Sequence, residues 1–342
     1  MVNYVMSRYV IILTILVSAV VSGIVGYGFA SLPREGITIF EPEPTPIPTP
    51  LAIYEIDNLA ETQIPKGEIE IKDIISEEDR YISYLFEHKF SPNLNTDKIK
   101  TVTGQINIPN EPGSYPLVFM IRGYVDQNIF ETGMGTKNAA AYFAENGFIT
   151  VAPDFLGYGG SSPEAGNIYE TRFQTYTTAL SILSSLSTIK QWNNKDLFIW
   201  AHSNGGQIAL TVLAITGREI PTTLWAPVTK PFPYSVLYYT DESHDGGKYI
   251  RRELAKFEEL YDVDKYTFSN YLKRIKALLL VHQGGADDAI PTEWSDSFVA
   301  KMRSLDNEVE YYKYPNADHN MRPDWDTVVA RDVDFFKENV QN

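Results

Sequence analysis

Apolar residues fall into two alternating patterns along this chain, short continuous runs and longer stretches with helical spacing. The short runs predict buried strands, and the spaced stretches predict helices that cover them. We expect strands at 69–72, 81–86, 100–109, 116–121, 148–152, 197–200, 221–225, 277–281 and 308–314, and helices at 137–146, 172–192, 207–214, 292–305 and 325–340. Because strands and helices alternate from residue 116 onward, the pattern predicts a mainly parallel sheet with helices on both faces.

The amino-terminal end has a different pattern. Residues 9–30 contain no charged side chain, and Arg8 is the only charge before them. At ~1.5 Å per residue, this run is long enough to cross a hydrocarbon layer about 30 Å thick. We therefore expect a single-pass transmembrane anchor, with residues 1–8 in the cytoplasm and the folded body on the other side. The alternative is a signal peptide that is cleaved near Ala30, which would release the protein.

A proline-rich segment follows the anchor. Between residues 41 and 50 every second residue is proline, which favours an extended, semi-rigid spacer that cannot join the interior of a sheet. We interpret residues 31–50 as a linker and residues 51–342 as one folded catalytic domain.

Composition excludes several classes of site and partner. The chain has 342 residues and a formal net charge of −15, which argues against nucleic acid or anionic lipid surfaces as partners. It has no cysteine, so disulfides, thiolate metal sites and a cysteine nucleophile are excluded.

The most informative stretch is Ala201-His202-Ser203-Asn204-Gly205, which lies between a predicted strand and a predicted helix. This is a variant of the Gly-x-Ser-x-Gly elbow, in which small residues let the strand turn sharply into the helix and present the serine at the apex. Ala201 replaces the usual first glycine. We expect Ser203 to be a nucleophile; the alternative is a simple helix N-cap.

A serine hydroxyl needs a base, and the base needs an orienting acid. Asp287 and Asp288 follow the strand at 277–281, and His319 follows the strand at 308–314, in the chain order serine, acid, histidine. Spacing alone does not rank the two adjacent acids. A metal site built from His282, Asp287, Asp288 and His319 is a competing interpretation, but no metal-ligand spacing supports it, so we expect no metal and no cofactor.

Together these residues resemble α/β-hydrolases over 119–319, and specifically the catalytic domain of the prolyl oligopeptidase family. The resemblance rests on the elbow, on the Asp-x-x-Gly-x-Gly-x-Ser loop within 152–161, on 281–291, and on Asp318-His319. It implies an α/β-hydrolase fold in which Asp287 is the triad acid, with Asp288 as the fallback.

The resemblance also implies an oxyanion hole and a substrate site. The backbone N–H groups of Tyr124 and Asn204 stand at the positions of the two oxyanion donors. Arg122-Gly123-Tyr124 replaces the His-Gly-Gly that is common in the family. Arg122 and Tyr158 are the substrate-binding candidates; Arg122 would face a substrate carboxylate or pair with a neighbouring acid.

The aromatic-rich insertion at about 231–271 stands where this fold usually places a lid, although a helical layer at 248–261 that packs its rings on the sheet is also compatible with it. The resemblance implies a serine hydrolase with an acyl-enzyme intermediate, most often a peptidase. The span from 50 to about 91 is too short for the propeller of the larger family members, so an esterase or lipase-like enzyme is the alternative. A catalytically silent binding module is a third possibility.

Overall fold

The computed structural model describes residues 17–22, 48–95 and 98–341. The chain divides into two units, Met1–Pro48 and Thr49–Asn342. In the first unit residues 17–22 are helical. Among the described residues, no helix is both long enough and apolar enough to cross a membrane. Most of the anchor predicted over residues 9–30, and most of the linker predicted over 31–50, lie outside the described residues.

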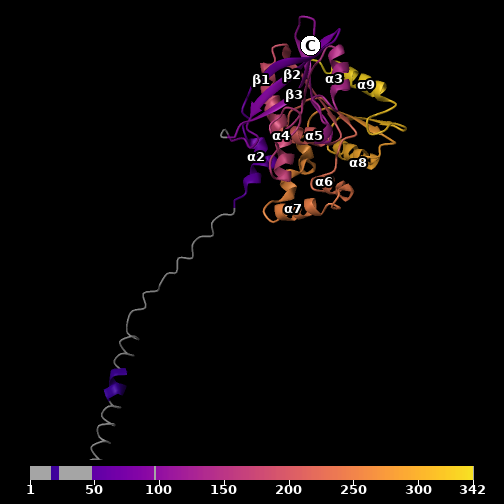
Figure 1. The fold of residues 1–342 in the computed structure, drawn as a ribbon. Coiled ribbons are helices and arrows are strands. Elements are labelled where there is room, and N and C mark those ends of the chain that lie inside the picture. The colour runs from indigo at the N-terminus through magenta and orange to yellow at the C-terminus, as the bar shows by residue number, and fades with distance from the viewer. Residues whose placement is uncertain (1–16, 23–47, 96–97, 342) are drawn as a thin grey trace, which may run out of the picture. The chain divides into compact units, whose positions relative to one another are not determined.

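The described part of the second unit forms one sheet of nine strands in the order β1-β2-β3-β5-β4-β6-β7-β8-β9 (Figure 1). The pairs β1–β2, β2–β3 and β3–β5 are antiparallel, and all pairs from β5 through β4 to β9 are parallel. The strands are β1 Ile69–Glu77, β2 Tyr81–Phe90, β3 Lys100–Pro109, β4 Tyr115–Ile121, β5 Ile149–Pro153, β6 Trp192–His202, β7 Thr222–Trp225, β8 Leu279–Gly284 and β9 Val309–Tyr314. The predicted mainly parallel sheet is confirmed.

Helices cover both faces of the sheet. On one face, α3 (Lys137–Glu145) and α9 (Trp325–Glu338) share a core with rings from β6, as in the contact between Phe198 and Phe336. The opposite face carries α4 (Ile168–Ser185), α5 (Asn204–Thr216) and α8 (Thr292–Arg303). The remaining helical turns are η1 Pro50–Tyr54, α2 Ile56–Glu61, η2 Gln127–Ile129 and η3 Leu186–Thr188. The two-sided cover expected from the alternating pattern is confirmed.

The helix predicted over 172–192 was wrong at both ends. It begins at Ile168, because the side-chain oxygen of Asn167 accepts hydrogen bonds from the N–H groups of Tyr169 and Glu170. It ends near residue 185, and Trp192 already belongs to β6, where it pairs with Tyr115. Residues 193–196 of β6 are polar, so the apolar run showed only the buried end of that strand.

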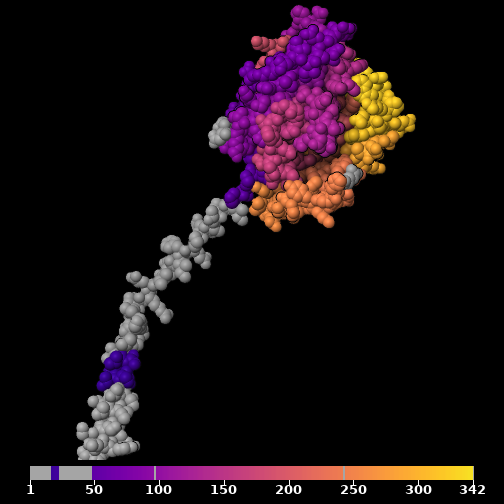
Figure 2. All heavy atoms as spheres, viewed as in Figure 1, coloured from indigo at the N-terminus to yellow at the C-terminus, as the bar shows by residue number. Residues whose placement is uncertain are grey.

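The insertion consists of short helices: α6 Tyr234–Leu237, η4 Thr240–Glu242, α7 Lys248–Glu258, η5 Val263–Tyr266 and η6 Phe268–Arg274. Figure 2 shows this part, in orange, at the end of the domain opposite to the violet antiparallel strands. Its buried rings meet α4: the ring of Phe173 lies 5.8 Å from that of Phe257 and 4.8 Å from that of Tyr266, between centroids. The helical layer predicted at 248–261 is therefore shorter than expected and rests on α4 rather than directly on the sheet.

Candidate active site

Ser203 is the single residue between the end of β6 and the start of α5, and its backbone conformation is strained. Its φ is 55° and its ψ is −121°, a region that costs a residue other than glycine about 1–3 kcal/mol. Backbone bonds on both sides maintain it: the N–H of Ser203 donates to Trp225 (2.9 Å), and its carbonyl accepts from Val228 (3.0 Å). The elbow predicted from the sequence is therefore formed.

The close approach of α5 to β4 explains the glycine after the elbow. A Cβ atom at Gly205 would lie 2.1 Å from the carbonyl oxygen of Ile121, so only glycine fits. Ala201 occupies a different environment, inside β6 between Ile121 and Leu224 of the neighbouring strands, and it is fully buried there. The alanine in place of the first glycine is thus accommodated without disturbing the turn.

His319 and Asp287 meet at the carboxyl edge of the sheet, in the loops after β9 and β8. The Nδ1 atom of His319 lies 3.0 Å from Oδ1 and 2.9 Å from Oδ2 of Asp287. The N–H groups of Ala289 and Ile290 each donate to the same carboxylate at 2.9 Å. Asp288, the fallback acid, is exposed and does not take this place.

The environment keeps Asp287 ionised. Its side chain is 0% exposed, and burial alone would raise its pKa. The hydrogen bond from His319 and those from the backbone of Ile290 and Ala289 outweigh that effect, so the pKa lies below its usual value. An ionised carboxylate on Nδ1 orients the ring and leaves Nε2 as the free position.

Ser203 and His319 lie at the same edge of the sheet, and His202 links the two loops that carry them. The ring of His202 lies 4.7 Å from the ring of His319, between centroids, and its Nε2 lies 3.0 Å from the backbone carbonyl oxygen of His319. Within the described residues the hydroxyl of Ser203 makes no hydrogen bond, so its contact with the His319 ring is not closed in this state. Such contacts are often long without substrate and tighten when it binds.

His202 is a neutral ring. Burial, and next the proximity of His319, lower its pKa to about 4. A neutral imidazole has one donor and one acceptor nitrogen, and because Nε2 faces a carbonyl oxygen, Nε2 carries the hydrogen. The sequence did not predict the bond of His202 to His319.

The loop after β4 passes directly beside the nucleophile. A Cβ atom at Gly123 would lie 2.9 Å from Cβ of Ser203. The N–H groups of Tyr124 and Asn204, the two predicted oxyanion donors, have no hydrogen-bond partner within the described chain, as expected at the first position of α5 for Asn204.

Arg122 holds the loop after β4 through hydrogen bonds to backbone carbonyls. Its guanidinium is buried (6% exposed) and donates from Nη1 to the carbonyl of Gly123 (2.9 Å) and from Nη2 to the carbonyl of Asp154 (2.7 Å). The carbonyl of Gly123 and the N–H of Tyr124 belong to one planar trans peptide, so they point in opposite directions. Holding that carbonyl therefore sets the direction of the Tyr124 N–H.

Tyr158 packs on the same guanidinium, with its ring centroid 4.0 Å from Cζ of Arg122, and its hydroxyl donates to Val125 (3.1 Å). Tyr158 and Arg122 line a cavity of about 190 Å³, which Tyr124 and Asn204 also line. Tyr158 thus has access to a bound substrate. The contacts of Arg122 favour a supporting role, and its predicted pairing with a substrate carboxylate stays a prediction.

His282 does not join the site. Its Nε2 lies 3.0 Å from Asp332 and its Nδ1 lies 2.8 Å from the hydroxyl of Tyr314, on the side of the sheet that α9 covers. The competing four-residue metal cluster is therefore not assembled, and no group of three acidic, histidine or cysteine side chains suited to a metal occurs in the described part of the chain.

Comparison with known proteins identifies a family and a relative by sequence. A family model described as the prolyl oligopeptidase family matches residues 135–342. Among curated proteins, acetyl esterase Axe7A of Xylanibacter ruminicola is 21% identical over 239 residues, which cover 62% of this chain and 52% of that protein. The chain thus spans about half the length of this relative.

Solved structures share the fold. The acetyl xylan esterase of Paenibacillus sp. R4 superposes with a TM-score of 0.61 at 18% identity, covering 83% of this chain and 93% of that one. Acetyl xylan esterase 1 of Thermoanaerobacterium sp. gives 0.55 at 18%, covering 85% and 95%. The acylaminoacyl peptidase of Pyrococcus horikoshii gives 0.54 at 15%, covering 82% and 51%. The domain therefore has the α/β-hydrolase fold.

Proposed function

This chain belongs to the prolyl oligopeptidase family, and we propose that it is a serine hydrolase that acts through an acyl-enzyme intermediate. The observation that carries the proposal is the contact of His319 with Asp287 at 2.9 Å, on the sheet edge where the elbow presents Ser203. A catalytically silent fold would have no reason to maintain both a strained serine and a buried, ionised carboxylate on a histidine.

Each residue has one task in the proposed reaction. Oγ of Ser203 attacks the substrate carbonyl while its proton passes to Nε2 of His319, and Asp287 stabilises the imidazolium that forms. The N–H groups of Tyr124 and Asn204 hold the oxyanion. The tetrahedral adduct then expels the leaving group, which takes the proton from His319. Water, deprotonated by the same ring, hydrolyses the acyl-serine and restores the free hydroxyl.

We propose esters of short acyl groups as the preferred substrates. The cavity beside the oxyanion donors measures about 190 Å³, whereas sites for drug-sized ligands measure roughly 300–1,000 Å³. The curated relative and two of the solved structures above are named acetyl or acetyl xylan esterases. Cleavage of a peptide bond is the second candidate, favoured by the family match, and it uses the same residues.

A substrate panel tests the proposal. We expect turnover of p-nitrophenyl acetate to exceed that of the octanoate ester and of peptide p-nitroanilides, and we expect a fluorophosphonate probe to label the wild type but not Ser203→Ala. Faster turnover of the anilides would identify a peptidase. Failure of a folded wild-type protein to be labelled, or full activity of Ser203→Ala, would refute the serine mechanism.

We also propose that residues 9–30 anchor the protein in a membrane with the catalytic domain on the extracytoplasmic side. The uncharged sequence of this segment and the helical conformation of residues 17–22 support the proposal. Fractionation of the full chain tests it: we expect the protein in the membrane pellet at its full mass. A soluble product that begins near Ser31 would identify a cleaved signal peptide instead.

A further inference from the structure

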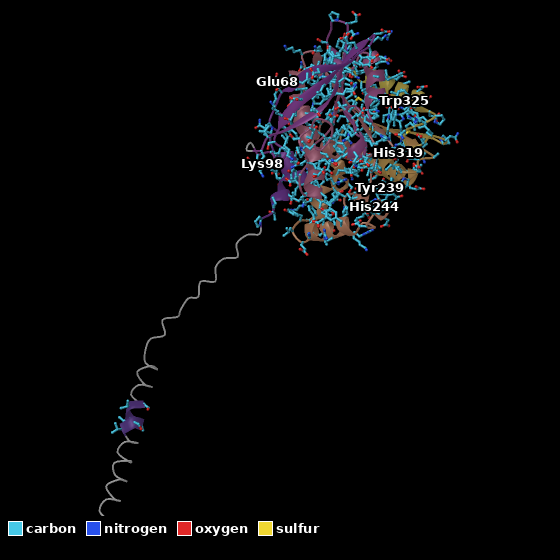
Figure 3. The ribbon with its side chains drawn as sticks, in the orientation of Figure 1. Glu68, Lys98, Tyr239, His244, His319 and Trp325 are labelled. Atoms are coloured by element: carbon cyan, nitrogen blue, oxygen red, sulfur yellow. The ribbon has the colours of Figure 1, made fainter. Side chains whose placement is uncertain are left out.

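A second cavity, of about 410 Å³, lies on the side of the sheet that carries α3 and α9. It shares no lining residue with the cavity beside Tyr124 and Asn204. Three tryptophans line it, Trp200, Trp225 and Trp325, and we call it the tryptophan cavity. Figure 3 shows Trp325 on the same side of the domain as His319.

Aromatic rings connect this cavity to the catalytic histidine. The ring centroids of His202 and Trp200 lie 6.3 Å apart, those of Trp200 and Trp225 lie 5.4 Å apart, and those of Trp225 and Trp325 lie 6.3 Å apart. His202 lines the cavity on one side and bonds to the backbone of His319 on the other. The cavity is thus separated from the active site by His202 and is not part of it.

One buried donor at this cavity has no partner. The indole N–H of Trp200, a residue only 2% exposed, makes no hydrogen bond with any described residue. The neighbouring indole of Trp225, by contrast, donates to Asp332 at 2.7 Å. The Trp200 nitrogen itself is buried, so this residue offers the carbon part of its ring to a ligand in the cavity.

Two cationic side chains line this cavity in a strongly acidic chain. Lys137 and Arg322 line it, and neither side chain forms an ion pair or hydrogen bond with another described residue. The first turn of α3 borders it, and the N-cap residue Thr136 makes no side-chain capping bond. Among the described residues that line it, Glu131 is the only acidic one. Two such cations and a helix N-terminus at one cavity favour an anion.

We propose that the tryptophan cavity binds a small organic anion, a carboxylate or a phosphate monoester, whose ring or apolar body packs on the indoles. Lys137, Arg322 and the start of α3 hold the charged oxygens. The proposal does not rest on the proposed esterase or peptidase chemistry, because neither Lys137 nor Arg322 nor the start of α3 belongs to the triad or to the oxyanion loop.

The experiment measures binding to the full chain in which Ser203 has first been blocked with a fluorophosphonate. The probes are benzoate, phenyl phosphate, inorganic phosphate and the neutral benzyl alcohol, and the readouts are tryptophan fluorescence and calorimetry. We expect benzoate or phenyl phosphate to bind at one saturable site, with benzyl alcohol at least ~10-fold weaker, since a charge-assisted contact is lost. Inorganic phosphate alone should bind more weakly than phenyl phosphate.

Variants locate the site. The double variant Lys137→Gln/Arg322→Gln should weaken binding at least ~10-fold. Lys301→Gln, an exposed lysine on α8, is the control and should bind like the wild type. The proposal is overturned if neither aryl anion binds, if benzyl alcohol or inorganic phosphate binds equally well, or if the folded double variant keeps full affinity.

Discussion

His202 and His319 are joined by a hydrogen bond of 3.0 Å from a ring nitrogen to a backbone carbonyl oxygen. One residue immediately precedes the nucleophile and the other is the proposed base. The bond therefore connects the elbow directly to the loop that carries the base. The ring of His319 also contacts Asp287, so the base is held both through its ring and through its backbone.

The first prediction concerns this bond. Replacing His202 by leucine removes the donor and should lower kcat roughly 2- to 10-fold with little change in KM, because a net hydrogen bond contributes about 0.5–1.5 kcal/mol. His202→Gln keeps an N–H near the same place and should lose less. Steady-state kinetics on the preferred ester, with active sites counted by fluorophosphonate titration, measures both.

His88 provides the control for these variants. It is also a buried histidine, bonded to Ser181 at 2.8 Å, but it lies in β2. His88→Gln should reduce stability without changing kcat per active site. If His88→Gln and His202→Leu lowered kcat equally, the effect would be general destabilisation rather than positioning.

The second prediction is a pH dependence of stability. The pKa of His202 falls from 6.5 in the unfolded chain to about 4 in the folded protein. Between these two values the unfolded chain binds more protons than the folded one, so the free energy of unfolding should decrease as the pH falls from 6.5 toward 4. Urea unfolding at several pH values measures it. His202→Gln should show a shallower decline over that window; an identical slope in the two proteins would contradict the assignment.

The third prediction distinguishes the two adjacent acids. Asp287→Asn should lower kcat by about 10³- to 10⁴-fold, because an amide no longer holds the imidazolium or the correct tautomer. Asp288→Asn changes an exposed neighbour of the same size and charge, and should keep nearly wild-type kcat. Comparable losses in both variants would argue against Asp287 as the orienting acid.

The fourth prediction concerns Arg122. Arg122→Met frees the Gly123–Tyr124 peptide and should lower kcat by roughly 10- to 100-fold, less than the ~10²- to 10³-fold expected for complete loss of an oxyanion donor. Arg122→Lys can donate to one of the two carbonyls but not to both, so its kcat should fall between those of the wild type and Arg122→Met. Affinity for a boronate analogue of the tetrahedral adduct should fall in parallel with kcat/KM. The exposed Arg218→Gln is the control. A rise in KM alone would indicate instead that Arg122 binds the substrate.

The fifth prediction tests the packing under the elbow. Gly205→Ala places a methyl group 2.1 Å from the carbonyl oxygen of Ile121, and should destabilise the domain by at least about 1–3 kcal/mol. Gly166→Ala meets nothing within 4 Å and should be neutral or slightly stabilising. Chemical denaturation of both variants tests the difference, and a wild-type midpoint for Gly205→Ala would contradict the close approach of α5 to β4.

The sequence predicted those features that local patterns encode. Buried strands are continuous apolar runs, so the order of elements and the parallel sheet followed from them, and the elbow has its own local signature around Ser203. The ends of helices and strands were harder to predict. The start of α4 depends on the side chain of Asn167, and residues 193–196 of β6 are polar, so no continuous apolar pattern marks either boundary.

The remaining site geometry depends on partners that sequence spacing does not reveal. Asp287 and Asp288 are equivalent by spacing, and only the turn that brings the N–H groups of Ala289 and Ile290 onto one carboxylate distinguishes them. Arg122 bonds to backbone carbonyls, which every residue carries, so nothing in the sequence marks its partners. The contact of His202 with His319 joins residues 117 positions apart.

The rings of the insertion are part of the main core, since Phe232, Phe257, Tyr266 and Phe268 are almost completely buried in it. Exposing four such rings would cost roughly 6–12 kcal/mol, comparable to the whole stability of many domains. The segment therefore cannot swing aside as a hinged flap during each catalytic cycle. Substrates must therefore enter through a mouth that is already open.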